Sequence, residues 1–345
     1  MVNGSDPARE TSVKKALIAV ILLVLALSTA QSQTLIGAGS TFDYPIFSKW
    51  FAEYSAAHPG VEINYQSIGS GGGIKQFCSG TVDFGATDMP MTDDMMKTCG
   101  RKVVHLPVVL GAVVPVFNVP GVSDLRFSGD VLADIYLGKI PSWSDPRIAK
   151  DNPGVKLPDQ KIIVVHRSDG SGTSFVWTDY LSKVSKEWAD GPGKGTSPSW
   201  PVGVGGKGNE GVAGLTRQLP GAIGYVELIY ALQNKIAFGA IKNAAGNWIT
   251  ASIPGVTAAA ASVKSMPADF RVSITDAPGA DAYPVSSFSW IIVSPEGQDA
   301  AKRKVLKDQL SWVVKSGESE ASALSYAPLP ESVAQKELEA IYALK

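Results

Sequence analysis

Residues 161–181 read KIIVVHRSDGSGTSFVWTDYL, and this stretch indicates the fold class of the chain. Its first part is rich in β-branched residues, as a strand would be, and apolar residues then return at helical spacing from Phe175 onward. A strand that passes through a short Gly/Ser/Thr turn into a helix is the repeating unit of α/β proteins. We expect this helix to run through Leu181 and Val184 to Trp188.

Strand signals and helix signals alternate along the rest of the chain in the same way. Strands are predicted for TLIGAG (34–39), VEINYQSI (61–68), VDFGAT (82–87), VVHLPVVLGAVVPVFNV (103–119) and the start of AIGYVELIYAL (222–232). Helices are predicted for DYPIFSKWFAEYSAAHPG (43–60), GIKQFCSG (73–80), TDDMMKTC (92–99), QDAAKRKVLKDQLSWVVKSG (298–317) and PESVAQKELEAIYALK (330–345). This alternation predicts an α/β fold with mostly parallel sheets flanked by helices. The Gly/Pro-rich residues 190–210 are expected to form a loop.

The length of 345 residues suggests about two domains. Their boundary is expected to be a pair of strand crossings rather than a linker, because β-like segments continue without a break near Leu110–Gly111 and near Ala282–Pro284. One domain would then combine both parts of the chain at its ends, residues 33–110 and 284–345. The other domain would comprise residues 111–283.

The first 32 residues are predicted to be a signal peptide. The basic pair Lys14–Lys15 precedes an apolar run at 16–27, and the small residues that follow suit cleavage after Ala30 or Ser32. The apolar run is shorter than the roughly 20 residues that a membrane-spanning helix needs; a retained N-terminal anchor is the alternative. We therefore expect an exported protein of the periplasm.

The charge balance of the chain excludes one class of partner. The whole chain has a formal net charge of −1, and removal of residues 1–30 leaves 28 basic and 30 acidic residues. A nucleic-acid-binding protein would show a basic footprint, so we expect no nucleic-acid partner. Recognition of an anion would have to come from a few local groups rather than from the field of the whole protein.

The chain contains two cysteines, Cys78 and Cys99. Because exported proteins meet an oxidising environment, we predict one disulfide between them, closing a loop of about 20 residues. Two free buried thiols are the alternative. No metal site is predicted, since neither the cysteines nor His58, His105 and His166 have the spacing of a ligand set.

Three Gly/Ser/Thr loops precede predicted helices: GAGSTF (37–42), IGSGGGIKQF (68–77) and RSDGSGTSF (167–175). The N-terminus of a helix has backbone N–H groups without partners and a partial positive charge, and both favour a bound anion. Each loop alone is as well explained by ordinary helix capping, and none matches the P-loop or the complete dinucleotide-binding pattern. Three such loops in one exported α/β chain predict helix ends that converge on a small anion.

Arg167 is the expected charge partner of that anion, because a planar guanidinium can bind an oxyanion through two donors at once. Asp169 is expected to orient the guanidinium. A simple surface ion pair between these two residues is the alternative.

Asp88 is the expected acceptor among these donors. An ionised carboxylate only accepts hydrogen bonds, so it favours phosphate, which keeps a proton at neutral pH, over sulfate, which has none. The alternative role for Asp88 is that of a helix cap ahead of Thr92.

At this point the chain resembles one family, the periplasmic phosphate-binding proteins of bacterial ABC phosphate importers. The resemblance covers essentially all of the predicted exported chain. It rests on GAGSTFDYPIFSKW (37–50), NYQSIGSGGGIKQF (64–77), VDFGATDMPM (82–91), LADIYLGKIPSWSDP (132–146), VVHRSDGSGTSFVWTDYL (164–181), VGGKGNEGVAGLTRQLPGAIGYVE (204–227) and SYAPLPESV (325–333).

The resemblance implies a two-lobed, hinged fold that closes over one phosphate, without a cofactor and without catalysis, and a membrane permease as partner. We expect the protein to be a monomer. The implied phosphate ligands are Thr41, Phe42 through its backbone N–H, Ser70, Asp88, Arg167, Ser171, Gly172 and Thr173, with Asp169 holding Arg167.

Two features depart from the family pattern, the cysteine pair and His166. A His166 that faced the ligand would make binding depend on pH, whereas a histidine at the end of a strand is more often structural.

Other functions are also compatible with parts of this pattern. A secreted phosphatase or phosphotransferase could use the same anion cradle, but Ser171 lacks the nucleophile-elbow pattern and His166 has no evident orienting partner. A receptor for sulfate, molybdate or tungstate conflicts with Asp88, because those oxyanions carry no proton at neutral pH. An adhesin or surface phosphate scavenger without a permease would have the same site.

Overall fold

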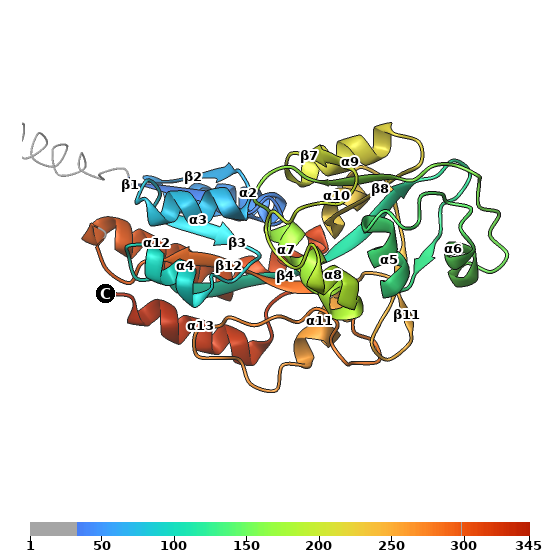
Figure 1. The fold of residues 1–345 in the computed structure, drawn as a ribbon. Helices are drawn as coiled ribbons and strands as arrows, with labels where there is room; N and C mark the ends of the chain where they lie inside the picture. Colours follow the sequence, from blue (N-terminus) through green and yellow to red (C-terminus); the bar gives the residue numbers. More distant parts are fainter. Residues whose placement is uncertain (1–32, 298) are drawn as a thin grey trace, which may run out of the picture.

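One long mixed sheet runs through both halves of the molecule (Figure 1). The computed structural model describes residues 33–297 and 299–345, so the predicted signal peptide and its cleavage site lie outside the described residues. The strands lie in the order β2 (Val61–Ser67), β1 (Gln33–Gly39), β3 (Phe84–Thr87), β12 (Ser286–Val293), β4 (Val104–Asn118), β8 (Ala222–Glu227), β6 (Ile163–Arg167) and β7 (Val204–Gly206).

Strand β4 is shared by the two halves of this sheet. Its residues 104–112 pair with β12, and its residues 113–118 pair with β8, both in antiparallel register. In one half β1 is parallel to β2 and β3, and in the other half β6 is parallel to β7 and β8. The prediction of an α/β fold with mostly parallel sheets is confirmed, with β12 as the antiparallel exception in one half and β4 in the other.

The two halves have separate sets of helices (Figure 1). The half with β1 has α2 (Tyr44–Ala57), α3 (Ser70–Cys78), α4 (Asp93–Thr98), α12 (Ala300–Lys315), the 3-10 helix η1 (Gly317–Leu324) and α13 (Glu331–Ala343). The half with β6 has α5 (Gly129–Tyr136), α6 (Pro146–Asp151), α7 (Gly172–Val184), α8 (Lys186–Asp190), α9 (Gly208–Gln218) and α10 (Leu228–Gln233). Helix α11 (Ile253–Ala261) packs against both β12 and β4.

Local sequence signals account for the helices of the first half. Pro45 stands in the first turn of α2, where a missing N–H leaves no helical hydrogen bond unmade. Thr92 caps α4, since its side chain accepts a hydrogen bond from the Met95 N–H. The apolar face of α2 is buried through Ile46, Phe47, Trp50, Phe51 and Tyr54.

The predicted helix from Phe175 to Trp188 is interrupted, which corrects the sequence-based expectation. Helix α7 ends at Val184 and α8 begins at Lys186. Ser185 between them has an extended backbone, and its side chain accepts a hydrogen bond from the Trp188 N–H, so it caps a new helix instead of continuing the old one.

Several short elements carry no clear sequence signal. Residues 190–210 include strand β7 and the start of α9, so only part of this Gly/Pro-rich segment is a loop. A small second sheet is formed by β11 (Trp248–Ile249), β10 (Ala240–Lys242) and β5 (Arg126–Phe127), and β9 (Ala237–Phe238) pairs with β4. Strands of two or three residues are too short for a periodic pattern, and tertiary contacts decide where they form.

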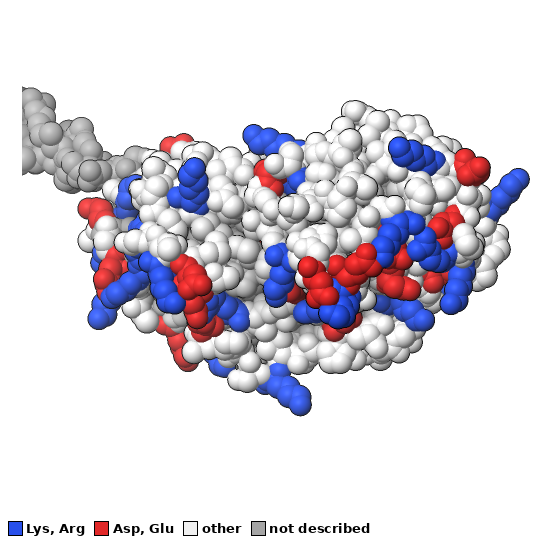
Figure 2. Space-filling model, in the orientation of Figure 1, with Lys and Arg blue, Asp and Glu red and all other residues white. Residues whose placement is uncertain are grey.

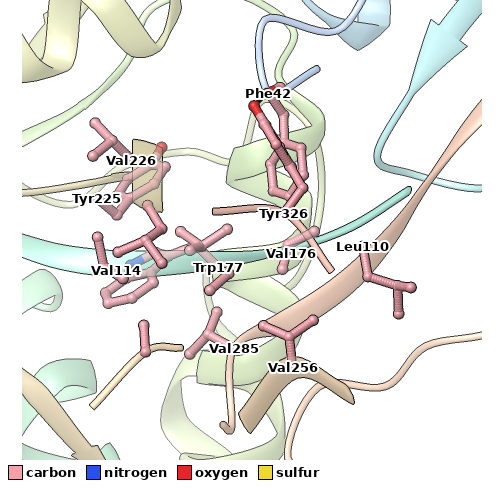
Figure 3. Close-up of a cluster of buried hydrophobic side chains, with 14 of the residues drawn as sticks. Phe42, Leu110, Val114, Val176, Trp177, Tyr225, Val226, Val256, Val285 and Tyr326 are labelled. Atoms are coloured by element: carbon pink, nitrogen blue, oxygen red, sulfur yellow. Dashed lines mark hydrogen bonds between the residues drawn. The ribbon is translucent and has the colours of Figure 1, made fainter. Parts of the chain in front are cut away.

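Apolar side chains from both halves join in one core. Where the halves meet, Phe42 and Tyr326 lie side by side, with ring centroids 6.1 Å apart, and Trp177 stacks on Tyr225 at 5.4 Å (Figure 3). The Tyr326 hydroxyl also donates to the Phe42 carbonyl oxygen at 2.5 Å. This contact anchors the loop that precedes α2.

Charged side chains of both signs are intermixed on the face of the molecule that Figure 2 shows. The ion pairs at the protein surface include Lys102 with Glu296 and Arg147 with Asp134. Among the residues that the structure describes, none of the helices combines the length and the apolar character needed to cross a membrane.

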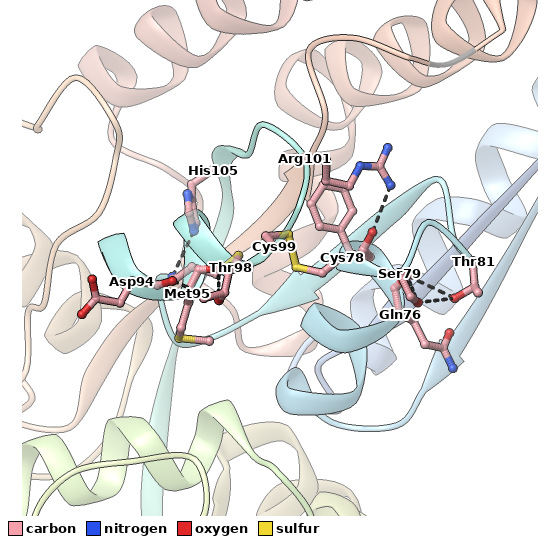
Figure 4. Close-up of a disulfide and its surroundings, with 12 residues drawn as sticks. Gln76, Cys78, Ser79, Thr81, Asp94, Met95, Thr98, Cys99, Arg101 and His105 are labelled. Carbon is pink, nitrogen blue, oxygen red and sulfur yellow. Dashed lines mark hydrogen bonds between the residues drawn. A yellow bond between two sulfur atoms is a disulfide. The ribbon is translucent and has the colours of Figure 1, made fainter.

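A disulfide joins Cys78 to Cys99 (Figure 4). Cys78 is the last residue of α3, and Cys99 follows the last turn of α4, so the bond ties the ends of these two helices together. Because the first turn of α3 lies at the candidate site described below, the disulfide stiffens an element that positions it.

Candidate functional site

The three Gly/Ser/Thr loops meet between the two halves of the sheet. The Gly71 N–H, in the first turn of α3, donates to the Gly170 carbonyl oxygen, just before α7, at 2.8 Å. Thr41, just before α2, accepts a hydrogen bond from the Asn209 amide group at 2.8 Å, and Asn209 lies in the first turn of α9. Four helix N-termini, those of α2, α3, α7 and α9, are therefore brought to one place, where their partial positive charges favour an anion.

Asp88 lies buried at the end of β3 among hydroxyl groups. Its Oδ1 accepts hydrogen bonds from Ser40 Oγ at 2.5 Å and from Ser289 Oγ at 2.9 Å, and its own N–H donates to Ser70 Oγ at 3.2 Å. Burial raises the pKa of Asp88 to about 6, although its hydroxyl partners and the charge of Arg167 lower it. At pH 7 most of this carboxyl is ionised, so it accepts hydrogen bonds.

Arg167 is buried at the end of β6 and is held by Asp169. Its Nε and Nη2 donate to the two carboxylate oxygens of Asp169 at 2.9 and 2.5 Å, and Asp169 Oδ1 also accepts from the Gly208 N–H at 3.0 Å. Burial raises the pKa of Asp169, but the hydrogen bonds and charge of Arg167 outweigh it, and the pKa lies below the usual value. Arg167 and Asp169 thus form a buried bidentate ion pair, in which two guanidinium nitrogens donate to the two carboxylate oxygens. The alternative of a surface ion pair does not apply.

The loop before α7 supplies small residues where the backbones approach closely. Ser171 Oγ accepts from the Ser174 N–H at 3.0 Å, so Ser171 caps α7. Thr173 Oγ1 accepts from Arg167 Nη1 at 3.4 Å. At Gly172 a Cβ atom would stand 2.5 Å from Asp88 Oδ2, which leaves no room for a side chain.

A second glycine is required across the junction. Gly69 has a φ of +85°, which disfavours any residue with a Cβ, and a Cβ there would stand 2.7 Å from the Gly170 carbonyl oxygen. Both loops depend on glycine because their backbones lie against each other.

The loop before α2 is held by contacts from both halves. Thr41 Oγ1 accepts from the backbone and the side-chain amide of Asn209 at 3.2 and 2.8 Å. The Phe42 N–H donates to Ser40 Oγ at 2.9 Å, and the Thr41 carbonyl oxygen accepts from the Tyr230 hydroxyl at 2.6 Å. Ser40 forms hydrogen bonds to both the Phe42 N–H and Asp88, so it links the loop that contains Thr41 and Phe42 to Asp88.

Several residues of the site were missed by sequence reasoning. Ser40 lies inside the quoted loop GAGSTF but has no signal of its own there, and Asn209 lies in segment 204–227, which carries the family resemblance but was not assigned a role in the site. Ser289 is in the middle of the buried strand β12, some two hundred residues from Asp88 in sequence, and reads as an ordinary strand residue. Their positions follow from strand and helix packing, which the sequence pattern does not give.

His166 is placed away from Asp88 and its partners. Its ring stacks on Trp200 with centroids 4.9 Å apart, and its Nδ1 lies 3.0 Å from the Arg167 carbonyl oxygen. Burial lowers the pKa of His166, although the contact with that carbonyl raises it. Since neighbouring residues of a strand point to opposite faces, His166 turns outward where Arg167 turns inward.

The arrangement can bind a small oxyanion that carries a proton. Helix N-termini and the Arg167 guanidinium supply donors, Asp88 supplies an acceptor, and the surroundings are largely shielded from water. In a water-poor site each of these charge-assisted contacts is stronger than it would be at the surface.

The chain is similar to known proteins over most of its length. The model of the PBP superfamily domain matches residues 26–318. A phosphate-binding protein PstS of Xylella fastidiosa is 48% identical over 316 residues, which cover 91% of this chain and 86% of the relative. A phosphate-binding protein PstS of Pasteurella multocida is 45% identical and covers 94% of both chains.

Solved structures show the same fold at lower identity. A high-affinity periplasmic phosphate-binding protein (PfluDING) bound with phosphate has a TM-score of 0.69 at 20% identity, with 88% of this chain and 92% of that chain covered. A phosphate-binding protein from Stenotrophomonas maltophilia has a TM-score of 0.68 at 16% identity, with 89% and 93% covered.

Proposed function

The chain belongs to the PstS phosphate-binding proteins of the PBP superfamily, and we propose that it captures inorganic phosphate between its two lobes and delivers it to an ABC-type membrane permease. The observation that carries the proposal is the junction itself. One buried acceptor, Asp88, comes from one lobe, and one buried guanidinium, Arg167, comes from the other, among converging helix N-termini.

Asp88 makes phosphate the preferred guest. Its Oδ1 accepts hydrogen bonds from two hydroxyl groups, and we assign to Oδ2 the hydrogen bond from the protonated oxygen of the ligand. Monobasic and dibasic phosphate both carry such a proton at neutral pH, whereas sulfate would face the carboxylate with lone pairs only. Leaving a buried carboxylate unpaired against an anion costs far more than a missing apolar contact would.

The remaining ligand assignments follow the loops. We assign phosphate contacts to the first loop through Thr41 and the Phe42 N–H, to the second loop through Ser70, and to the third through Ser171, Gly172 and Thr173. Asp169 holds the Arg167 guanidinium without touching the ligand. Gly172 lies against Ser70 and Asp88, and Thr173 contacts Arg167, which supports these assignments.

We place the lobes at residues 33–110 with 284–345 and at residues 111–283, with hinges where the chain crosses between them. The register of β4 supports this division, because its partner changes from β12 to β8 between Ala112 and Val113. The bonds Gly71 to Gly170 and Asn209 to Thr41 join the lobes, so the described conformation is a closed one. Hinge motion would open it for phosphate to enter.

The protein acts as a periplasmic receptor without catalysis in this proposal. The relatives are named as binding proteins, and the one histidine beside Arg167 stacks on Trp200 rather than lying against a hydroxyl group. A monomer is sufficient, because both lobes and all of the assigned ligands come from one chain.

Calorimetric titration of the purified protein tests the proposal. We expect phosphate to bind with a dissociation constant of about 1 μM or tighter, which corresponds to about −8 kcal/mol. We expect arsenate, which also keeps a proton, to compete, and sulfate to bind at least about 100-fold more weakly. Equal affinity for sulfate and phosphate would contradict the role of Asp88, and turnover of phosphate esters would contradict the absence of catalysis.

A further inference from the structure

A second buried carboxyl group, that of Asp43, lies directly behind Asp88. Asp43 occupies the N-cap position of α2 but makes no side-chain cap hydrogen bond there. Its Oδ2 instead lies 2.5 Å from Ser289 Oγ, and its Oδ1 has no hydrogen-bond partner among the described residues. An aspartate at an N-cap usually accepts a hydrogen bond from a backbone N–H of the helix. Helix capping therefore does not account for the buried side chain of Asp43.

Ser289 lies between the two carboxyl groups. Its Oγ is 2.5 Å from Asp43 Oδ2 and 2.9 Å from Asp88 Oδ1. A serine hydroxyl has one proton and can donate to only one of these oxygens. The other contact needs a proton of its own, because two oxygen atoms without a proton between them repel at such a distance. One of the two carboxyl groups must therefore be a carboxylic acid.

The surroundings place that proton on Asp43. Asp88 has the Arg167 charge on one side and accepts a second hydrogen bond from Ser40, and both favour its ionised form. Asp43 has no such cation among the groups that act on it. Burial, followed by the charge of Asp88, raises its pKa well above the usual value, and Ser289 and Ser40 only partly offset this rise.

The other titratable groups that face Asp43 reinforce the same state. Glu227, at the end of β8, Tyr65, on β2, and Tyr326, after η1, all interact electrostatically with Asp43. Glu227 and Tyr326 are buried and Tyr65 is half-buried, and each of the three would become negatively charged on losing a proton. None of them can stabilise a charge on Asp43.

We propose that Asp43 is a positioning residue that stays a carboxylic acid, donates to Ser289 and thereby makes Ser289 donate to Asp88, which holds Asp88 as the ionised acceptor for phosphate. This inference rests on the proposed function for its ligand. The chain from Asp43 through Ser289 to Asp88 determines which way the proton-accepting oxygen faces. Rejection of sulfate then depends on two residues that do not touch the anion.

The protonation of Asp43 can be observed directly by infrared difference spectroscopy. The buried groups Glu227 and Glu337 would give similar acid bands, so the wild-type spectrum is compared with that of Asp43→Asn at pH 7. We expect the variant to lose one carboxylic-acid carbonyl band. Asp179→Asn is the matched control and should lose none, because hydroxyl and lysine partners outweigh its burial and lower the pKa of Asp179 to about 2. If the band is lost in Asp88→Asn and kept in Asp43→Asn, the proton lies on Asp88 and the proposal is wrong.

Ligand titrations test whether this chain controls specificity. In Ser289→Ala, Asp88 loses a hydroxyl donor that favours its ionised form. We expect the preference for phosphate over sulfate to fall by about tenfold at pH 6, where more of Asp88 would become protonated, and to fall by less at pH 8. Ser286→Ala is the matched control: it removes a buried hydroxyl from the same strand, one that donates to the Tyr283 carbonyl oxygen. An unchanged preference in Ser289→Ala would overturn the proposal.

The conservative variant separates this role from a merely structural one. Asn at position 43 can donate to Ser289 as the acid does, so Asp43→Asn should restore the preference that Asp43→Ala loses. Loss of preference in both variants would count against the acid, and thermal unfolding identifies any variant that fails to fold. Titration of the wild-type protein with phosphate tests the proposed function. The infrared band of Asp43 is measured without a ligand and tests only the protonation of Asp43. A failure of one proposal can therefore be told apart from a failure of the other.

Discussion

The backbones of Gly71 and Gly170 lie in contact across the junction between the two lobes. The Gly71 N–H donates to the Gly170 carbonyl oxygen at 2.8 Å, and a Cβ added at Gly71 would stand 3.1 Å from the Gly170 Cα. Gly71 is the second residue of α3, and Gly170 lies two residues before α7 begins at Gly172. The N-termini of the two helices can lie this close together because neither loop has a side chain at the point of contact.

A side chain at Gly71 should therefore hold the lobes apart. We expect Gly71→Val to weaken phosphate binding at least about tenfold, because closure would force the branched side chain against the Gly170 backbone. Calorimetry gives the affinity, and small-angle X-ray scattering should show that phosphate no longer reduces the radius of gyration. Gly214→Ala is the control, since that helical glycine has open space around it. Normal closure of Gly71→Val would show that this contact is dispensable.

Arg167 should be needed for both binding and stability. In Arg167→Ala, Asp169 remains as a largely buried charge without its partner, and we expect phosphate affinity to fall by about 3 kcal/mol, or more than 100-fold. The variant should also unfold at lower urea concentration in the absence of phosphate. Arg147→Ala removes an exposed arginine with two ion pairs. It should change the free energy of phosphate binding and the free energy of unfolding by no more than about 1 kcal/mol each. Wild-type phosphate affinity in Arg167→Ala would show that the guanidinium does not contribute to binding.

Replacement of Asp88 should abolish the discrimination between anions. Asn at this position offers an amide donor as well as an acceptor, so we expect Asp88→Asn to bind sulfate and phosphate within about tenfold of each other. Competition titrations measure this ratio, and Asp94→Asn, at an exposed position of α4, should leave it at the wild-type value. A variant that still rejects sulfate would show that another group reads the proton of the ligand.

The buried carboxyl of Asp88 should also make the ligand-free protein less stable at neutral pH. Burial raises its pKa from 3.8 to about 6, so the folded protein binds this proton more tightly than the unfolded chain does. Stability is therefore lost as the pH rises from about 4 to about 6, by up to about 3 kcal/mol. Urea unfolding should find Asp88→Asn more stable than wild type at pH 7 and nearly equal at pH 4. If Asp88→Asn were less stable than wild type at pH 7, the predicted loss of stability from the buried Asp88 charge would be wrong.

Reduction of the disulfide should loosen the elements that support the site. Cys78 and Cys99 are 21 residues apart, and closing a loop of that length stabilises the folded state by about 3 kcal/mol in the chain-entropy model. We expect dithiothreitol to lower the unfolding free energy of wild type by roughly this amount. The double variant Cys78→Ser, Cys99→Ser should behave as the reduced protein does and should not respond to the reductant.

Local pattern was enough to predict most of the architecture. The strands and helices of residues 33–120 lie within a few residues of where alternation and helical spacing predict them, since these patterns depend on close neighbours in the chain. The prediction failed at Ser185, where a side-chain cap competes with helix continuation within a single residue. A periodic pattern averages over a whole window and cannot resolve such a local choice.

The sequence alone indicated the α/β class, the three glycine-rich loops and the two charged residues of the candidate site, because each of these signals lies in a short contiguous stretch of chain. Only the tertiary structure decided that Ser289 and Asn209 join them. Trp290 pairs with Thr87 in the register of β12 and β3, which places Ser289 beside Asp88, and the packing of α9 brings Asn209 to Thr41. Such contacts depend on which strands pair and in what register, and that choice is made by the burial of the whole sheet rather than by any short stretch of chain.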